Sequence, residues 1–201
     1  MKLSQTISHI RDGVQLILPY IQAPADKSRP FLIAIDGRCA SGKTTLSNEL
    51  SQAISCPVIH MDHFFLPPPM RTKQRLSQPG GNVDRERFTS EVLSFLKSGS
   101  SFAYRPFECH TCSYGAPITI EASSVVIIEG SYACHPELRQ AYDLTVFMSV
   151  SPDIQSERIK KRNGKDAAAI FSQKWIPLEE AYFSAFDISN HCDLMLHTTF
   201  T

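Results

Sequence analysis

The sequence predicts a three-layer α/β sandwich with a parallel sheet of five strands and a small lid. Short apolar runs typical of buried strands alternate with longer stretches of helical periodicity. Strands separated by helices pair in parallel through right-handed crossovers, which places helices on both faces of the sheet. After a first strand that begins at Phe31, the expected strands are 57–62, 125–130, 143–150 and 192–198, and the expected helices are 43–55, 84–97, 152–162 and 173–187.

The length of 201 residues suits a single domain over 1–201. Residues 1–22 are expected to form an amphipathic helix beside the sheet, because Ile7, Ile10, Val14, Ile17 and Ile21 recur at helical spacing. Three further segments are expected to surround a ligand cleft at the carboxyl ends of the strands, namely a long loop at 63–83, a β-hairpin at 102–120 and the lid at 158–175.

The composition disfavours polymer and membrane partners. The 20 Lys and Arg residues balance the 20 Asp and Glu residues, so no global field attracts nucleic acid or an anionic membrane. Arg11 and Asp12 interrupt the apolar pattern at the N-terminus, which is unlike a secretory leader, and no run is long enough to span a membrane. We therefore expect a cytoplasmic protein with a small-molecule partner, and leave a homo-oligomer open.

Six cysteines are expected to be reduced thiols rather than a disulfide framework. The groups 109–112, 134–135 and 191–192 combine cysteine with histidine and could in principle hold zinc. Only the first group has ligand-like spacing, and the others lie far away in the sequence. Scattered buried thiols are the favoured interpretation.

A glycine-rich loop follows the first strand and ends on a lysine and a threonine. Gly37, four further residues and then Gly42, Lys43 and Thr44 fit the P-loop pattern, in which backbone N–H groups surround a polyphosphate. Lys43 would reach the β- and γ-phosphates, and the Thr44 hydroxyl would ligate Mg²⁺. The expected cofactors are ATP and Mg²⁺, bound by Gly37, Arg38, Cys39, Ala40, Ser41, Gly42, Lys43, Thr44 and Thr45.

Three carboxylates follow predicted strands at the edge where ligands bind. Asp62 could accept the proton of an attacking hydroxyl or hold Mg²⁺ through water, and the alternative is a carboxylate that caps a turn. Glu129 is placed like the acidic residue of a Walker-B strand, and the alternative is an exposed turn. Asp36 immediately precedes the P-loop, where bonding to loop amides is the favoured role.

Residues of the two cleft segments could recognise the phosphate acceptor. Asp84 could bind acceptor hydroxyls or could equally be the N-cap of the next helix. Tyr104, Arg105 and His110 on the hairpin could stack on and hydrogen-bond a planar ligand, although hairpin aromatics often belong to a core.

A basic run lies at the end of the helix 152–162. It is favoured as a lid that brings cations to the transferring phosphoryl group, and the alternative is a solvated face. Its members are Arg158, Lys160, Lys161, Arg162 and Lys165.

These blocks together resemble the uridine kinase-like branch of the P-loop kinases, which includes uridine/cytidine kinases, phosphoribulokinase, bacterial pantothenate kinase and nicotinamide riboside kinase. The similar blocks are IAIDGRCASGKTTL, MDHFFLP, GGNVDRERF, YRPFECHTCSYGAPITI, VVIIEGSYA and SERIKKR, in the order of that family. The resemblance implies Asp62 as general base, Glu129 as Walker-type acid, Asp84 as a binder of acceptor hydroxyls, Tyr104 and His110 in the acceptor pocket, and Arg158 and Arg162 as lid and phosphate contacts.

Two features depart from that family. After Arg162 the lid carries only Lys165 and Lys174, whereas an arginine-rich lid is expected. Arg105 stands where uridine kinases tend to have an acidic or neutral residue. Both departures concern the lid and the acceptor rather than the P-loop.

The sequence thus predicts an ATP-dependent kinase that moves a γ-phosphoryl group to a hydroxyl of a small metabolite, most plausibly a nucleoside. Lys43, Asp62 and Arg162 are the expected catalytic residues, and Thr44, Asp62 and Glu129 the expected metal site. A kinase of another alcohol, such as a sugar, pantothenate or a pyridine nucleoside, is one alternative. An NTPase switch that acts on a protein partner is the other.

Overall fold

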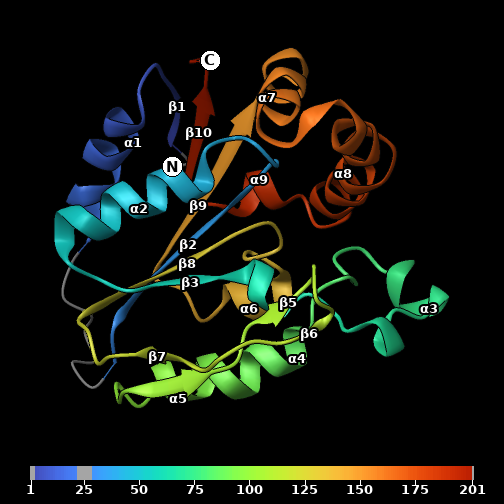
Figure 1. Ribbon diagram of the computed structural model, residues 1–201. Coiled ribbons are helices and arrows are strands. Elements are labelled where there is room, and N and C mark those ends of the chain that lie inside the picture. Colours follow the sequence, from blue (N-terminus) through green and yellow to red (C-terminus); the bar gives the residue numbers. More distant parts are fainter. Residues whose placement is uncertain (1–2, 22–28, 201) are drawn as a thin grey trace.

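The computed structural model describes residues 3–21 and 29–200, and its centre is a parallel β-sheet (Figure 1). Every strand of this sheet runs parallel to its neighbours. The strand order is β1 (Leu3–Ile7), β10 (Leu194–Thr198), β9 (Leu144–Val150), β2 (Phe31–Gly37), β8 (Val125–Glu129) and β3 (Val58–His60). The α/β class and the five predicted strands are confirmed, and β1 adds a sixth.

The strand β1 corrects the prediction for the N-terminal segment. Residues 3–7 are extended and pair with β10, with Leu3 opposite Leu194, and the helix α1 begins only at Ile10 and ends at Ile17. The Asp12 carboxylate accepts hydrogen bonds from the amides of Ser8 and His9, which fixes the start of the helix. The predicted helix 1–22 is therefore wrong before residue 10, and residues 1, 2 and 22 lie outside the described part.

Apolar side chains of the strands point alternately to two cores, one on each face of the sheet. In β2, Ile33 and Ile35 pack with α1 and α2 (Lys43–Ile54), whereas Leu32 and Ala34 face the opposite core. That opposite core is built from α4 (Arg85–Phe88), the π-helical η4 (Thr89–Leu93), α5 (Ser94–Leu96), α6 (Pro136–Arg139), α8 (Ile176–Ala185) and α9 (Ile188–His191). Helices cover both faces, so the three layers are confirmed (Figure 1).

The segments predicted around the cleft have structure of their own. The short helical turn η2 (Met61–Phe64) leads into the 63–83 stretch, which carries η3 (Pro68–Met70) and α3 (Lys73–Leu76). The hairpin forms two antiparallel pairs, with β4 (Phe102–Tyr104) beside β7 (Ile118–Ile120) and β5 (Phe107–Glu108) beside β6 (Ser113–Tyr114). In Figure 1 the β4–β7 part of the hairpin lies below the sheet, and the segment that carries α3 lies to its right.

The predicted lid is helical apart from a break at Gly164. It lies within α7 (Pro152–Ile170) and the π-helical η5 (Phe171–Trp175), which leads into α8. The helix α7 is interrupted at Gly164, where φ is 82° and ψ is 169°. This left-handed residue explains why helical periodicity in the sequence ends near residue 162.

None of the described helices is both long and apolar enough to cross a membrane. The cysteines are free, with Cys109 and Cys112 exposed and the other four buried. Among the described residues, no group of three or more His, Cys, Asp or Glu side chains could hold a metal ion. The favoured interpretation of scattered buried thiols fits Cys39, Cys56, Cys134 and Cys192, but it is wrong for Cys109 and Cys112, which are exposed on the hairpin.

The placement of β1 predicts a core role for Ile7. Its side chain is 1% exposed and packs in the same core as α1 and α2, whereas Gln5 on the same strand is exposed. Ile7→Ala should lower the free energy of unfolding by about 2–4 kcal/mol, because it leaves a cavity. Gln5→Ala should change it by about 0.5 kcal/mol or less. Urea denaturation checks both variants, and equal stabilities would contradict the strand.

Candidate active site

The P-loop connects the end of β2 with the start of α2, and its glycines are sterically required. Gly37 and Gly42 have φ angles of 138° and 97°. A Cβ atom on Gly37 would lie 2.0 Å from the carbonyl oxygen of Met148 in the neighbouring strand. The Lys43 ammonium donates to the carbonyl oxygens of Gly37 (2.8 Å) and Arg38 (2.9 Å), so it spans the mouth of the loop. This geometry leaves the loop free to surround a polyphosphate.

Side chains from α7, α8 and β10 hold the backbone of the loop. The Glu179 carboxylate accepts from the Cys39 amide at 2.9 Å, and the Gln155 amide donates to the Cys39 carbonyl at 3.0 Å. Arg158 donates to the Ala40 carbonyl at 2.8 Å, and the Thr198 hydroxyl donates to the carbonyl of Ser41 at 3.2 Å. The loop conformation is thus fixed by tertiary contacts as well as by its glycines.

Asp36 is a buried junction between three elements of the site. Its carboxylate accepts hydrogen bonds from the amides of Gly37 (2.6 Å), Tyr132 (3.1 Å) and Cys134 (2.9 Å) and from the Tyr182 hydroxyl (2.8 Å). Burial raises the pKa of Asp36 to about 6, against the effect of these donors, so the side chain is ionised at neutral pH. The expectation that Asp36 bonds to backbone amides beside the P-loop is confirmed.

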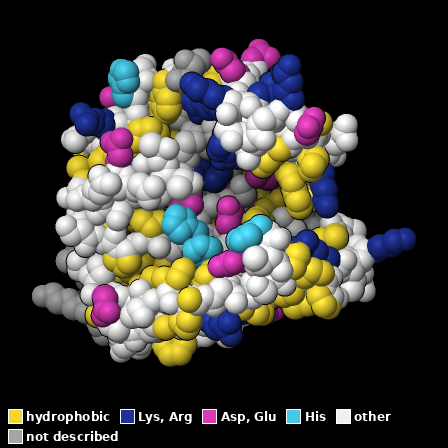
Figure 2. Space-filling view, in the orientation of Figure 1, with side chains coloured by type: hydrophobic (Ala, Val, Ile, Leu, Met, Phe, Trp, Pro, Cys, Tyr) yellow, Lys and Arg dark blue, Asp and Glu magenta, His cyan; other side chains and the backbone are white. Residues whose placement is uncertain are grey.

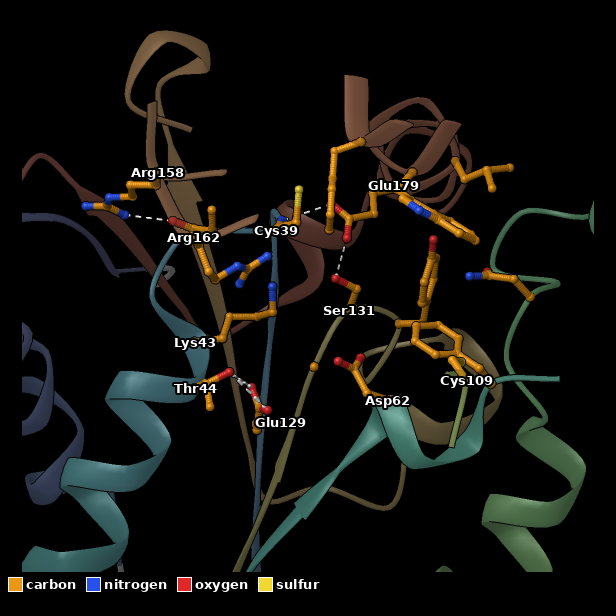
Figure 3. A pocket seen from close by; sticks show the side chains of 18 of the residues that line it. Cys39, Lys43, Thr44, Asp62, Cys109, Glu129, Ser131, Arg158, Arg162 and Glu179 are labelled. Carbon is orange, nitrogen blue, oxygen red and sulfur yellow. Dashed lines mark hydrogen bonds between the residues drawn. The ribbon is translucent and has the colours of Figure 1, made fainter. Parts of the chain in front are cut away.

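Thr44 and Glu129 bring oxygen atoms together from neighbouring elements. The Thr44 hydroxyl lies 3.3 Å from both carboxylate oxygens of Glu129, which is 4% exposed (Figure 3). The His60 ring also contacts Glu129, with Nδ1 2.6 Å from Oε1, and this hydrogen bond raises the pKa of His60. A hydroxyl and a carboxylate are the donors that Mg²⁺ prefers, so the residues present fit this ion.

Asp62, in η2 just after β3, lines the same cavity. Its side chain is accessible from the cavity and is otherwise surrounded by protein. These surroundings and the negative charge of Glu129 raise the pKa of Asp62, while the nearby charge of Lys43 acts in the opposite direction. Asp62 thus lies within electrostatic reach of both phosphate-binding and metal-binding candidates (Figure 3).

These residues share a cavity of about 750 Å³. Figure 2 shows a hollow in this face of the molecule, with basic side chains in and above it and acidic and histidine side chains along its lower side. The lid contributes Arg158, Lys161, Arg162 and Lys174 to the lining. The remaining walls include Phe65, Arg71, Leu76, Asn82, Cys109, Tyr132, Trp175 and Leu178.

Four residues predicted to bind the acceptor do not line this cavity. Asp84 accepts from the Arg87 amide at 3.0 Å and caps α4, which is the alternative role that the sequence left open. Tyr104 is buried, with its hydroxyl 2.9 Å from Nδ1 of His63. Arg105 donates to hairpin carbonyls, and the exposed His110 lies near Glu108. The sequence motifs predicted that these segments lie near the cleft, but they could not show which way each side chain points.

Arg158 and Arg38, which were predicted to contact the nucleotide, are bonded to groups of the protein instead. Arg158 lines the cavity but bonds to the Ala40 carbonyl and lies 4.6 Å from the Phe200 ring centroid. Arg38 points away from the cavity and pairs with Glu180 at 2.6 Å. Arg162 lines the cavity as expected of a lid arginine.

The sequence analysis did not single out Glu179, Arg71 or the aromatic walls. Glu179 is 6% exposed and accepts from the Ser131 hydroxyl at 2.6 Å as well as from the Cys39 amide. A glutamate within a predicted helix carries no sign of such contacts in the sequence alone. Arg71 lies within the predicted 63–83 loop, so its segment was identified while its role was not.

Comparisons with known proteins agree with this fold and these motifs, although no protein-family model matches the chain. A chloroplastic uridine/cytidine kinase of Arabidopsis thaliana is 25% identical over 185 residues, which cover 85% of this chain and 38% of that protein. The uridine kinase of Saccharomyces cerevisiae is 26% identical over 136 residues, or 62% of this chain and 27% of the relative. The chain thus spans less than two fifths of the length of these relatives.

Solved structures show the same fold. A possible uridine kinase from Bacillus stearothermophilus matches 93% of this chain and 98% of its own with a TM-score of 0.69 at 20% identity. A candidate fructose transport system kinase from Silicibacter matches 94% and 99% with a TM-score of 0.73 at 23% identity. By sequence and fold, the chain is similar to the uridine kinase-like P-loop kinases, and the resemblance is confirmed.

Glu179 and Glu180 are adjacent in α8, so substituting each in turn tests whether Glu179 stabilises the P-loop. Glu179→Gln should lower the free energy of unfolding by about 1–2 kcal/mol, because an amide offers only one acceptor to the two donors that meet there. Glu180→Gln weakens only the half-exposed pair with Arg38 and should cost about 0.5 kcal/mol or less. Urea denaturation measures both, and a larger loss for Glu180→Gln would contradict the assignment.

Proposed function

We propose that the chain is an ATP-dependent kinase that phosphorylates a hydroxyl group of a small metabolite. The observation that carries the proposal is the shared cavity, in which the P-loop residues Lys43 and Thr44, the acid Glu129 and the carboxylate Asp62 lie together. Cys109 lines the cavity on the side of Asp62 away from Lys43, and the proposal places the acceptor there (Figure 3). The uridine and cytidine kinases among its relatives support the same interpretation.

The side chains have distinct roles in this proposal. Lys43 would exchange its two carbonyl partners for the phosphates of ATP, and the loop amides would hold the polyphosphate. Thr44, Glu129 and Asp62 would hold Mg²⁺, which neutralises charge on the phosphates when bound. Asp62 would either accept the proton of the attacking hydroxyl or orient the metal.

Arg162, with Lys161 and Lys174, would bring positive charge to the transferring group.

The acceptor is proposed to be a small alcohol, and uridine and cytidine are the first to test because of the relatives. Asp84, Tyr104, Arg105 and His110 no longer support a nucleoside, since none of these four residues lines the cavity. A small-molecule partner and a cytoplasmic location remain part of the proposal. The balanced charge and the free cysteines support them.

The activity is tested by following ATP consumption with nucleosides, sugars and vitamin alcohols in turn. We expect ADP and a phosphorylated alcohol to form together with one acceptor class and little ATP loss without an acceptor. Lys43→Ala should reduce this turnover by about 10²-fold or more, because it removes the positive charge at the reacting end of the polyphosphate. Lys97→Ala removes an exposed positive charge away from the cavity lining and should leave turnover near wild type.

Two outcomes would overturn the proposal. Turnover of Lys43→Ala close to wild type would contradict the P-loop assignment. ATP hydrolysis that a protein stimulates, and that every alcohol leaves unchanged, would indicate the NTPase switch instead.

Asp62→Asn separates its two candidate roles. The substitution keeps the size of the side chain but removes its basic oxygen. A general base should show a fall in kcat of about 10²-fold to 10⁴-fold with little change in ATP affinity. Steady-state kinetics and Mg²⁺-dependent nucleotide binding are measured together. Weakened Mg²⁺-dependent binding with an intact kcat would make Asp62 a metal-orienting residue.

A further inference from the structure

The cavity lining includes apolar walls besides the nucleotide-binding candidates. Phe65, Leu76, Trp175 and Leu178 supply apolar surface to it, and Asn82, which bonds to the Tyr132 hydroxyl, supplies an amide. Arg71 is the cation that the 63–83 segment contributes to the lining. The Arg71 side chain is half-buried, so its charge is partly shielded from water and an anionic group of a ligand could pair with it.

Arg71 differs from the other arginines of the segment that precedes the hairpin. Arg75 pairs with Glu86 at 2.7 Å, Arg85 with Glu137 at 3.3 Å and Arg87 with Glu91 at 3.1 Å. Across residues 3–21 and 29–200, no carboxylate lies within 4.0 Å of Arg71. The three paired arginines lie outside the cavity lining, whereas the unpaired one lines it.

Contacts with the protein fix the orientation of this guanidinium group. Its Nε atom donates to the Leu66 carbonyl at 2.7 Å, and its carbon lies 6.0 Å from the Phe107 ring centroid. The Cys109 thiol, a weak acceptor, lies beside it. With Nε used, the two terminal nitrogens form the edge that binds a carboxylate or phosphate in bidentate fashion.

The electrostatic neighbours of Asp62 and Cys109 indicate that Arg71 lies on the side of Asp62 away from the P-loop. The Lys43 charge acts on Asp62, and the charges of Asp62 and Arg71 both act on Cys109. Figure 3 shows Asp62 between Lys43 and Cys109. A molecule whose anionic group lies on Arg71 could therefore present a hydroxyl to Asp62 and to the nucleotide site beyond it.

We propose that Arg71 binds an oxyanion of the phosphate acceptor, so that the acceptor is an alcohol that also carries a carboxylate or a phosphate group. The inference rests on the proposed kinase function and narrows its substrate class. The transfer breaks the bond between the γ-phosphorus and the bridging oxygen, which leaves with ADP, and forms a bond to the acceptor oxygen, whose proton passes to Asp62 or solvent. Arg71 positions the acceptor and takes no part in the bond changes.

Matched pairs of alcohols test the charge requirement directly. Glycerol is compared with glycerate, ribose with ribose 5-phosphate, and uridine with its 6-carboxylate, in wild type and in Arg71→Met. We expect kcat/KM to favour the anionic member of at least one pair by about 10-fold or more, and Arg71→Met to lower it for that member by about 10- to 100-fold, mainly through KM. Activity with the neutral member should change by about 2-fold or less.

Two further variants keep the test sharp. Arg71→Lys keeps the charge but loses the bidentate edge, so its kcat/KM should fall between those of wild type and Arg71→Met. Lys73→Met removes one positive charge from the exposed surface of the same segment and should leave both members of each pair unchanged. Unchanged Mg-ATP affinity in Arg71→Met shows that the variant is folded and that its nucleotide site is intact.

The outcomes distinguish this inference from the proposed function. Turnover of neutral alcohols that equals turnover of their anionic partners, with no effect of Arg71→Met, overturns the Arg71 site while the kinase function stands. If no alcohol is phosphorylated, the kinase proposal fails, and calorimetry of glycerate and ribose 5-phosphate with nucleotide-loaded protein decides the Arg71 site separately. Binding that Arg71→Met loses would support the site, and equal or absent binding would overturn it.

Discussion

Four hydrogen-bond donors converge on the buried carboxylate of Asp36, and the shape of the site depends on this junction. The amide of Gly37 belongs to the start of the P-loop, the amides of Tyr132 and Cys134 to the turn after β8, and the Tyr182 hydroxyl to α8. A carboxylate with no exposed surface remains ionised at neutral pH only when such donors surround it. The strand that carries the P-loop, the turn after Glu129 and the helix behind the lid are therefore held at one point.

The contacts of the P-loop extend this junction to the lid. Glu179 lies one helical turn before Tyr182 and holds the Cys39 amide, while Arg158 in α7 holds the Ala40 carbonyl. The lid, through Arg158, and the helix behind it, through Glu179, thus both contact the loop backbone directly, so their positions and the shape of the loop depend on one another. In the cavity beneath, Asp62 lies between Lys43 and Cys109, and Arg71 contacts the Cys109 thiol.

The sequence predicted the parts of this structure that depend on periodicity and on strand ends. Lys43, Glu129 and Asp62 were expected together because the carboxyl ends of parallel strands meet at one edge. The strand β1 was missed because Ile7 continues the helical spacing of α1, and a strand with one buried residue leaves a weak pattern. Asp84, Arg71 and Glu179 could not be assigned, since their roles depend on which tertiary neighbours their side chains meet.

The central claim is that one cavity holds Mg-ATP on the P-loop with Asp62 facing the γ-phosphate and open space beyond. The most direct measurement is a crystal structure of the protein with Mg²⁺ and a non-hydrolysable ATP analogue. We expect Lys43 to bind the β- and γ-phosphates, Thr44 and Glu129 to hold the ion directly or through water, and the Asp62 carboxylate to lie within one water molecule of the γ-phosphate. A triphosphate bound away from residues 37–45, or an Asp62 side chain turned away from it, would contradict the account.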